Sequence, residues 1–294
     1  MKSFSIVRNW KIFFAISIIF LMIGYSSMIF RGFNLGIDFT GGSIMDLKFE
    51  KEVQVAQVRE VLSKHDLGSA IIQLESNDSE ATLSQGVLIR TQVIPDNERT
   101  SVMQDMEKSL GKFEIRRVEN VGATIGSELI QQAAVAIFLS WVLMIVYITM
   151  RFQLNFALAA IIALMIDVSV TLSWFSLLQL EIDSTFVAAL LTVVGYSVNG
   201  TIIIFDRIRE NLKTHRRSET VTDMIDNSIR STLTRTVYTT LTTLFAIVAI
   251  FLFGGETIHN FAFAMLVGCC SGTYTSILLA GTIWLFLQHK KAGE

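Results

Sequence analysis

The chain has 294 residues, of which 51% are hydrophobic, and a formal net charge of −2. A mean hydropathy of +0.52 is too high for a soluble domain of this length, so a soluble enzyme is excluded. Several runs of about 20 apolar residues are long enough to cross about 30 Å of hydrocarbon. We therefore expect a helical membrane protein with several spans.

Six transmembrane helices are predicted from these apolar runs. They are expected at 12–30, 130–150, 156–178, 186–205, 237–253 and 261–287. The five helices within 128–287 would follow an extracytoplasmic domain at 31–127, and a cytoplasmic loop would occupy 206–236.

Lys and Arg residues indicate the orientation of these spans. They precede the first span, follow the second, fill the loop at 206–236 and occur again in the last residues. Because basic residues accumulate in cytoplasmic loops, both termini, 1–11 and 288–294, are predicted to be cytoplasmic.

The segment 31–127 is predicted to form a small α+β domain outside the cytoplasm. Hydrophobic periodicity indicates strands at 43–49, 70–74, 86–93 and 113–118, and helices at 53–65 and 97–110. The order strand–helix–strand–strand–helix–strand is that of a ferredoxin-like βαββαβ fold. Residues 32–126 include 10 basic and 15 acidic residues, so nucleic acid is not an expected partner.

A glycine-rich turn, NLGIDFTGGS at 34–43, joins the first span to the first strand. Its glycines can adopt backbone conformations or close contacts that other residues resist. We hypothesise that it transmits helix movement to the outer domain, and the alternative is a rigid exit turn. The residues assigned to this hinge are Gly36, Asp38, Phe39, Gly41 and Gly42, and Asp38 and Thr40 would pin the turn.

Asp167 is the clearest polar residue within the predicted spans. A charged side chain near mid-bilayer costs about 2.5–3.5 kcal/mol on insertion scales, so such a residue is a functional candidate. One interpretation is a proton-carrying carboxyl group, with Thr171 and Trp174 on the same helix face. The other is an aspartate that hydrogen-bonds neighbouring helices together.

The fourth and fifth spans carry further polar residues. Tyr196, Asn199 and Gly200 mark one face of the fourth span, and Arg235, Thr236 and Thr239 begin the fifth. These faces are candidates for a polar conduit. The alternatives are a packing seam in the fourth span, threonines bonded to their own helix in the fifth, and a snorkelling Arg235.

Two sequence blocks resemble the SecF family, which belongs with SecD to the RND-like transporter superfamily. The first is the G-x-D-F-x-G-G pattern of the turn at 36–42, and the second is VGYSVNGTIIIFDRIREN at 194–211. The second block supplies a cytoplasmic motif, whose residues are Asp206, Arg207, Arg209, Glu210 and Asn211. The resemblance covers essentially the whole chain.

This resemblance implies an auxiliary subunit of the Sec protein translocase in the bacterial inner membrane. Such a subunit uses the proton-motive force, together with SecD, to complete preprotein export. The implied partners are a SecD-like subunit, a SecYEG-like channel, YajC-like and YidC-like subunits, the emerging preprotein and membrane lipids. No cofactor or metal is implied, and no catalytic site of its own is expected.

Two departures from the family pattern leave alternatives open. Gly200 stands where the family has an Asp in the fourth span, and Ile166 stands where it often has His before Asp167. Direct proton carriage through the fourth span is therefore in question. Asp167 carrying part of the role, a carboxylate of the SecD partner being sufficient, and an altered or inactive sequence are the alternatives. The competing functions are an RND-like exporter half for lipid or small molecules, and a scaffold of the Sec channel without proton coupling.

Overall fold

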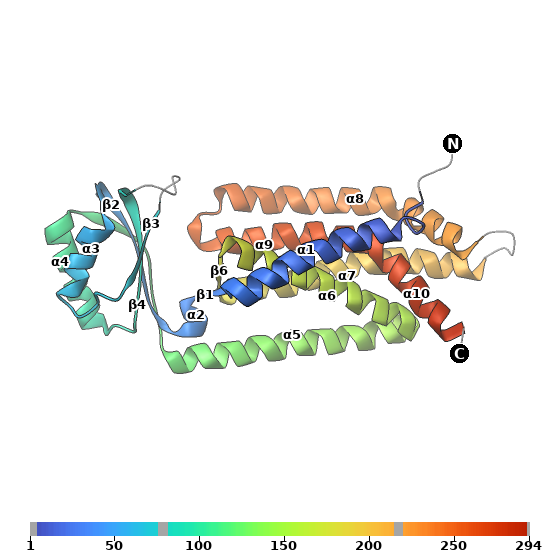
Figure 1. Ribbon diagram of the computed structural model, residues 1–294, viewed down its shortest axis with the longest axis horizontal. Helices are drawn as coiled ribbons and strands as arrows, with labels where there is room; N and C mark the ends of the chain where they lie inside the picture. The colour runs from blue at the N-terminus through green and yellow to red at the C-terminus, as the bar shows by residue number, and fades with distance from the viewer. Residues whose placement is uncertain (1–4, 76–81, 215–219, 293–294) are drawn as a thin grey trace. The chain divides into compact units, whose positions relative to one another are not determined.

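The structure, a computed structural model, describes residues 5–75, 82–214 and 220–292 (Figure 1). It separates into two compact units. One consists of Met1–Asn34 and Ala133–Glu294, and the other is Leu35–Gln132.

The first unit is a helical bundle. Among the described residues, six helical segments are long and apolar enough to cross a membrane. They are α1 (Trp10–Arg31), α5 (Ala123–Arg151), α6 (Leu154–Leu178), α7 (Ser184–Lys213), α8 (Val221–Phe253), and a last segment built from α9 (Glu256–Tyr274), the π-helical η1 (Thr275–Ala280) and α10 (Gly281–Ala292). The chain is therefore a multi-pass membrane protein.

Much of the predicted cytoplasmic loop at 206–236 is helical. Helix α7 continues to Lys213, and α8 already begins at Val221, where the Thr220 hydroxyl caps it by accepting from the Asp223 amide at 3.2 Å. The prediction ended each span where the apolar run ended. Helical hydrogen bonds do not require apolar side chains, so both helices extend beyond their hydrophobic parts.

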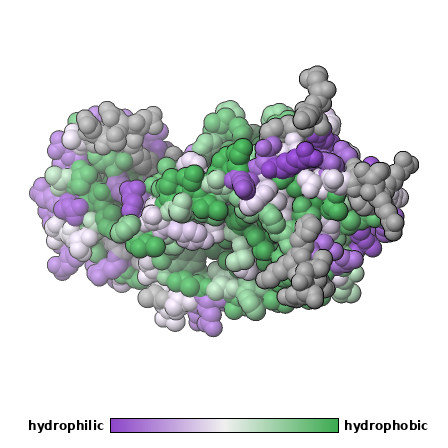
Figure 2. Space-filling model, turned by 45° about the vertical axis from the view of Figure 1, so that its right-hand side comes forward, coloured by the Kyte–Doolittle hydropathy of each residue, from purple (hydrophilic) through white to green (hydrophobic). Residues whose placement is uncertain are grey.

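The bundle has inner and outer helices. In their most apolar stretches, 56% of α6 and 61% of the last segment are buried, against 6% of α5. Glycines allow the inner helices to approach closely: a Cβ atom on Gly272 would lie 2.8 Å from Ser197 Cβ, and one on Gly268 would lie 2.3 Å from Val193. Hydrophobic side chains cover much of the visible bundle surface (Figure 2), as expected for contact with lipid.

The start of α1 is attached to α8 by one buried carboxylate. Asp226 accepts hydrogen bonds from the backbone amides of Ile6 and Val7, each at 3.0 Å, and from the Ser5 hydroxyl. These amides precede a helix whose N-cap, Asn9, makes no side-chain capping bond. Asp226 therefore satisfies backbone donors that would otherwise lack partners.

Among its described residues, the second unit has a four-stranded sheet and two longer helices that share one core, together with a single helical turn. Its elements are α2 (Ile37–Thr40), β2 (Gly42–Val53), α3 (Val55–Ser63), β3 (Ile71–Glu75), β4 (Ser84–Thr91), α4 (Asp96–Leu110) and β5 (Phe113–Val121). The sheet is antiparallel in the order β3-β4-β2-β5. Its core residues, including Leu47, Val58, Val87 and Met106, are fully buried.

Two very short strands, β1 (Asn34–Leu35) and β6 (Glu181–Ile182), form a separate two-stranded sheet. The Asn34 side-chain amide donates to the Gln179 carbonyl at 3.0 Å. Gln179 itself ends α6 in the left-handed conformation, with φ 53°. These contacts hold the end of α1 beside the end of α6.

Candidate functional site

Asp167 lies in the interior of the bundle and is completely buried. Its carboxylate accepts from the hydroxyls of Ser197 at 2.5 Å and Ser271 at 2.7 Å. Thr275 Oγ1 lies 2.9 Å from both carboxylate oxygens. The carboxyl group of α6 is thus held by hydroxyls from α7, α9 and η1.

This cluster satisfies a carboxyl group in an apolar interior, where an unpaired one would be costly. No Lys, Arg or His from the described residues bonds to Asp167; its carboxyl partners are hydroxyls. A hydroxyl can donate or accept, so the cluster can adapt when the carboxyl group gains or loses a proton. The predicted neighbour Thr171 bonds instead to the backbone carbonyl of Asp167, at 2.9 Å.

The π-helical segment η1 begins at Thr275, one of the three donors. Such wide turns interrupt α-helices and occur frequently at functional sites. The next residue, Ser276, shares a hydrogen bond of 2.9 Å with the Thr201 hydroxyl of α7. A Cβ atom on Gly200 would lie 3.1 Å from Ser276 Oγ. The glycine therefore leaves room for this contact between α7 and η1.

A small polar cavity of about 210 Å³ lies beside this region, between α7, α8 and α9. It collects most of the predicted conduit residues: Tyr196, Asn199, Gly200, Thr236 and Thr239. The Tyr196 hydroxyl donates to Thr240 Oγ1 at 2.8 Å, and Thr240 contacts Thr273 Oγ1 at 2.9 Å. Thr236 and Thr239 bond to carbonyls of their own helix, which is the alternative given for the threonines of the fifth span.

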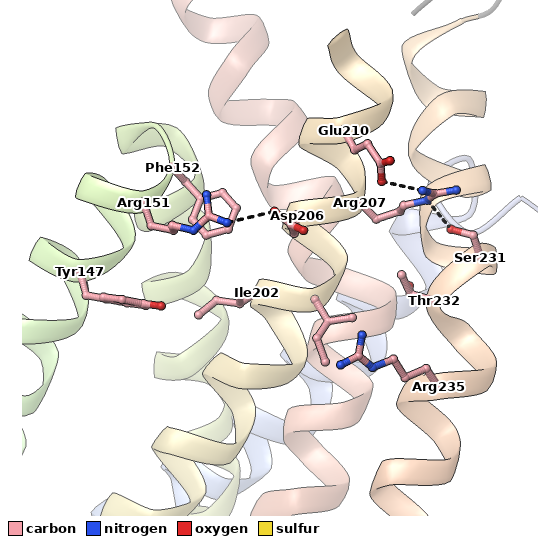
Figure 3. A pocket seen from close by; sticks show the side chains of 11 residues that line it. Tyr147, Arg151, Phe152, Ile202, Asp206, Arg207, Glu210, Ser231, Thr232 and Arg235 are labelled. Carbon is pink, nitrogen blue, oxygen red and sulfur yellow. Dashed lines mark hydrogen bonds and ion pairs between the residues drawn. The ribbon is translucent and has the colours of Figure 1, made fainter. Parts of the chain in front are cut away.

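A larger cavity of about 560 Å³ lies between α5, α7 and α8 (Figure 3). We call it the basic-end pocket; its lining includes Tyr147, Arg151, Phe152, Ile202, Ile203, Asp206, Arg207, Glu210, Ser231, Thr232 and Arg235. Arg207 binds Glu210 at 2.6 Å and Ser231 at 3.1 Å, and Arg151 lies 3.9 Å from Asp206.

The remaining residues of the DRIREN motif join neighbouring segments. Arg209 donates to the backbone carbonyl of Arg151 at 3.1 Å, and its guanidinium group lies 5.6 Å from the centre of the Phe152 ring. Asn211 donates to the Ser228 hydroxyl of α8 at 2.7 Å. The motif therefore connects α7 to the end of α5 and to α8.

The structure divides the predicted intramembrane residues among three places. Asp167 lies in its own hydroxyl cluster, and Arg235 lines the basic-end pocket. The other five line the small polar cavity. The donors to Asp167 were not recognised in the sequence, although Ser271 and Thr275 have the i, i+4 spacing that puts two hydroxyls on one helix face.

The glycine-rich turn is a single helical turn, α2, with glycines on both sides. Gly41 and Gly42 have positive φ values of 71° and 135°, whereas Gly36 has an ordinary φ of −70°. Thr40 pins the turn by donating to the Gly36 carbonyl at 3.1 Å. A Cβ atom on Gly126, at the start of α5, would lie 2.8 Å from the Phe39 carbonyl oxygen. The segment that follows α1 and the start of α5 thus meet at α2.

Comparison with known proteins identifies the family. Residues 26–53 match the SecD/SecF GG motif, and residues 101–290 match the C-terminal region of protein export membrane protein SecD/SecF. Protein translocase subunit SecF of Acidaminococcus fermentans is 67% identical over 99% of both chains. The subunit of the same name from Sebaldella termitidis is 38% identical, over 97% of this chain and 92% of its own.

A solved structure agrees with these relatives. The crystal structure of SecDF, a translocon-associated membrane protein from Thermus thermophilus, has a TM-score of 0.86 and 32% sequence identity. The match covers 97% of this chain and 39% of the crystallised chain, so this chain spans about two fifths of that protein. The chain belongs to the SecD/SecF family of protein export membrane proteins, in its SecF branch.

Proposed function

We propose that the chain is an auxiliary, non-enzymatic subunit of the Sec protein translocase that works with a SecD-like partner. Its near full-length similarity to subunits named SecF supports this role. The similarity to part of a longer SecDF chain supports a partner that supplies the remaining SecD portion.

The proposed activity is completion of preprotein export at the expense of the proton-motive force. One observation carries this proposal: Asp167 is fully buried and bonded by hydroxyls from three other helical elements. A change in its protonation would alter bonds to α7, α9 and η1 together. The polar path would include Tyr196, Asn199, Gly200, Thr236 and Thr239, with Arg235 at one end.

The proposed topology places both termini in the cytoplasm of a bacterial cell and the bundle in its inner membrane. The asymmetric distribution of Lys and Arg supports this orientation. Residues 31–127 would form a ferredoxin-like module on the other side, where it would hold the emerging preprotein. The turn at 36–42 would transmit movement to it. SecYEG-like, YajC-like and YidC-like subunits are the further proposed partners.

The test is preprotein export into membrane vesicles that hold the chain, a SecD-like partner and the Sec channel. Export is measured with and without a proton gradient. Asp167→Asn is expected to abolish the gradient-dependent part of export, because an amide, unlike a carboxyl group, does not gain and lose a proton at physiological pH. Thr192→Val is the matched control, because Thr192 is exposed on α7 and its hydroxyl, among the described residues, bonds to the Ala188 carbonyl of its own helix.

Gly200 supports a second candidate, a scaffold of the Sec channel without proton coupling. In that case neither Asp167→Asn nor Gly200→Asp changes gradient-dependent export. An increase of gradient-driven export in Gly200→Asp would instead identify a motor half limited by the missing carboxylate. The third alternative, an RND-like exporter half, predicts bound lipid or small molecules rather than Sec subunits after purification from membranes.

A further inference from the structure

The basic-end pocket brings together arginines from three helical segments. Arg151 ends α5, Arg207 lies on α7 and Arg235 lies on α8. Figure 3 shows the Arg235 side chain extending from α8 toward α7 across the cavity. The cavity thus gathers positive charge at the end of the bundle where these helices leave their apolar stretches.

The charges within the pocket are not balanced. Glu210 accepts a direct bond from Arg207, and Asp206 lies 3.9 Å from Arg151, so each of these arginines has a carboxylate beside it. No described residue forms an ion pair or side-chain hydrogen bond with the guanidinium group of Arg235, and Ile203 and Thr232 also line the pocket. The lining therefore has three positive and two negative side chains, and one cation lacks a counter-charge.

The other walls of the pocket are apolar or aromatic. Ile202 and Ile203 lie on α7, and Tyr147 and Phe152 approach from the side of α5. Tyr147 is 57% exposed, and its hydroxyl points toward the cavity in Figure 3. A ligand that fits these walls has an anionic part and an apolar part. A free inorganic anion would contact the arginines but would leave the apolar walls without a partner.

We propose that the basic-end pocket binds the headgroup of an anionic phospholipid, with its phosphodiester held by the Arg235 guanidinium group. One phosphodiester carries the single negative charge that balances the lining. The planar guanidinium group can bond two phosphate oxygens at once. Ile202, Ile203 and Phe152 would contact the first part of the acyl chains, and basic pockets between transmembrane helices are known to suit such headgroups.

The experiment measures lipid binding to the purified full-length chain in detergent by native mass spectrometry. The probes are phosphatidylglycerol, phosphatidylcholine and inorganic phosphate. The chain is expected to bind phosphatidylglycerol more tightly than phosphatidylcholine. Arg235→Gln should weaken phosphatidylglycerol binding about fivefold or more, the contribution of one basic residue near an anionic lipid. Arg235→Lys, which keeps the positive charge, should weaken phosphatidylglycerol binding less than Arg235→Gln does.

Arg230→Gln is the matched control, since Arg230 is exposed on the same helix and does not line the cavity. It should leave phosphatidylglycerol binding unchanged. Equal binding of both lipids, or an Arg235→Gln chain that binds like the unaltered one, would overturn the proposal. Displacement of phosphatidylglycerol by millimolar inorganic phosphate would also overturn it, because the site would then recognise phosphate alone. The readout is independent of export activity.

Discussion

Position 200 shows how one missing side chain shapes the contact between α7 and η1. A Cβ atom there would lie 3.1 Å from Ser276 Oγ, whose hydrogen bond to Thr201 limits its freedom to move. An added Cβ on Gly195, on the same helix, would meet no atom of another described part of the chain within 4 Å. Substituting each glycine by alanine therefore distinguishes two effects: helix propensity acts at both positions, and crowding acts at position 200.

Gly195→Ala is expected to raise stability by up to about 1 kcal/mol, the difference in helix propensity between glycine and alanine. Gly200→Ala should instead lower stability or leave it unchanged, because overpacking costs about 1–3 kcal/mol and offsets that gain. In a Ser276→Ala background the Oγ contact is gone, and Gly200→Ala should become more favourable. Thermal unfolding in detergent measures all four chains. Identical gains at both glycines would contradict this account.

Asp105 gives a second test at the residue scale, in the β-containing unit. Hydrogen bonds from Lys108 at 3.3 Å and His65 at 3.1 Å lower the pKa of Asp105 below its usual value of 3.8. A lowered pKa favours folding above pH 3.8, and this contribution is lost as the pH falls through the value of the folded state.

Lys108→Gln is therefore expected to raise the pKa of Asp105 toward 3.8, and His65→Gln should do so to a smaller extent. Carboxyl-carbon NMR of the Asp-labelled chain measures this titration. Lys64→Gln is the control, because Lys64 lies beside His65 in the sequence and has no part in the Asp105 contacts. An unchanged Asp105 titration in both variants would show that the two bonds do not act in solution.

At the scale of the elements, backbone atoms crowd two glycines close to α2. Its flanking Gly42 adopts φ 135°, and an added Cβ would lie 2.6 Å from the Thr91 carbonyl oxygen. Gly126 at the start of α5 faces the Phe39 carbonyl group in the same way. These obstacles are backbone atoms, so rotation of a side chain cannot relieve them.

Gly126→Ala is accordingly expected to push α5 away from α2, to lower stability by about 1–3 kcal/mol and to reduce export. Gly122→Ala provides a matched control four residues earlier, because an added Cβ there would meet no described residue beyond its chain neighbours within 4 Å. The apparent melting temperature and vesicle export are measured together. Full export by Gly126→Ala would show that close contact between α2 and α5 is not needed for transmission.

At the scale of the whole molecule, we predict that residues 31–127 and the segment between α7 and α8 lie on opposite sides of the membrane. Native Cys269 and Cys270 are replaced by Ser, and single cysteines are placed at exposed Lys213 and Ser101. A membrane-impermeant thiol reagent applied to intact cells is expected to label position 101 in preference to position 213. Inside-out vesicles should reverse the preference. The same preference in both preparations would refute the proposed topology.

The sequence alone was enough to identify six apolar segments, because a membrane span is defined by the composition of a continuous stretch. It was also enough for the order of strands and helices between 42 and 121, since each element has its own periodicity. The glycines of the turn could be recognised because only glycine readily adopts the positive φ found at Gly41 and Gly42.

Only the tertiary structure showed which polar residues meet. Asp167 is bonded by residues 30, 104 and 108 positions away, and periodicity within one helix cannot reveal such distant partners. The separation of Arg235 from the polar cavity likewise depends on how α7 and α8 pack. Composition determined which segments enter the membrane, whereas rotation and close approach of the helices decided which side chains share a site.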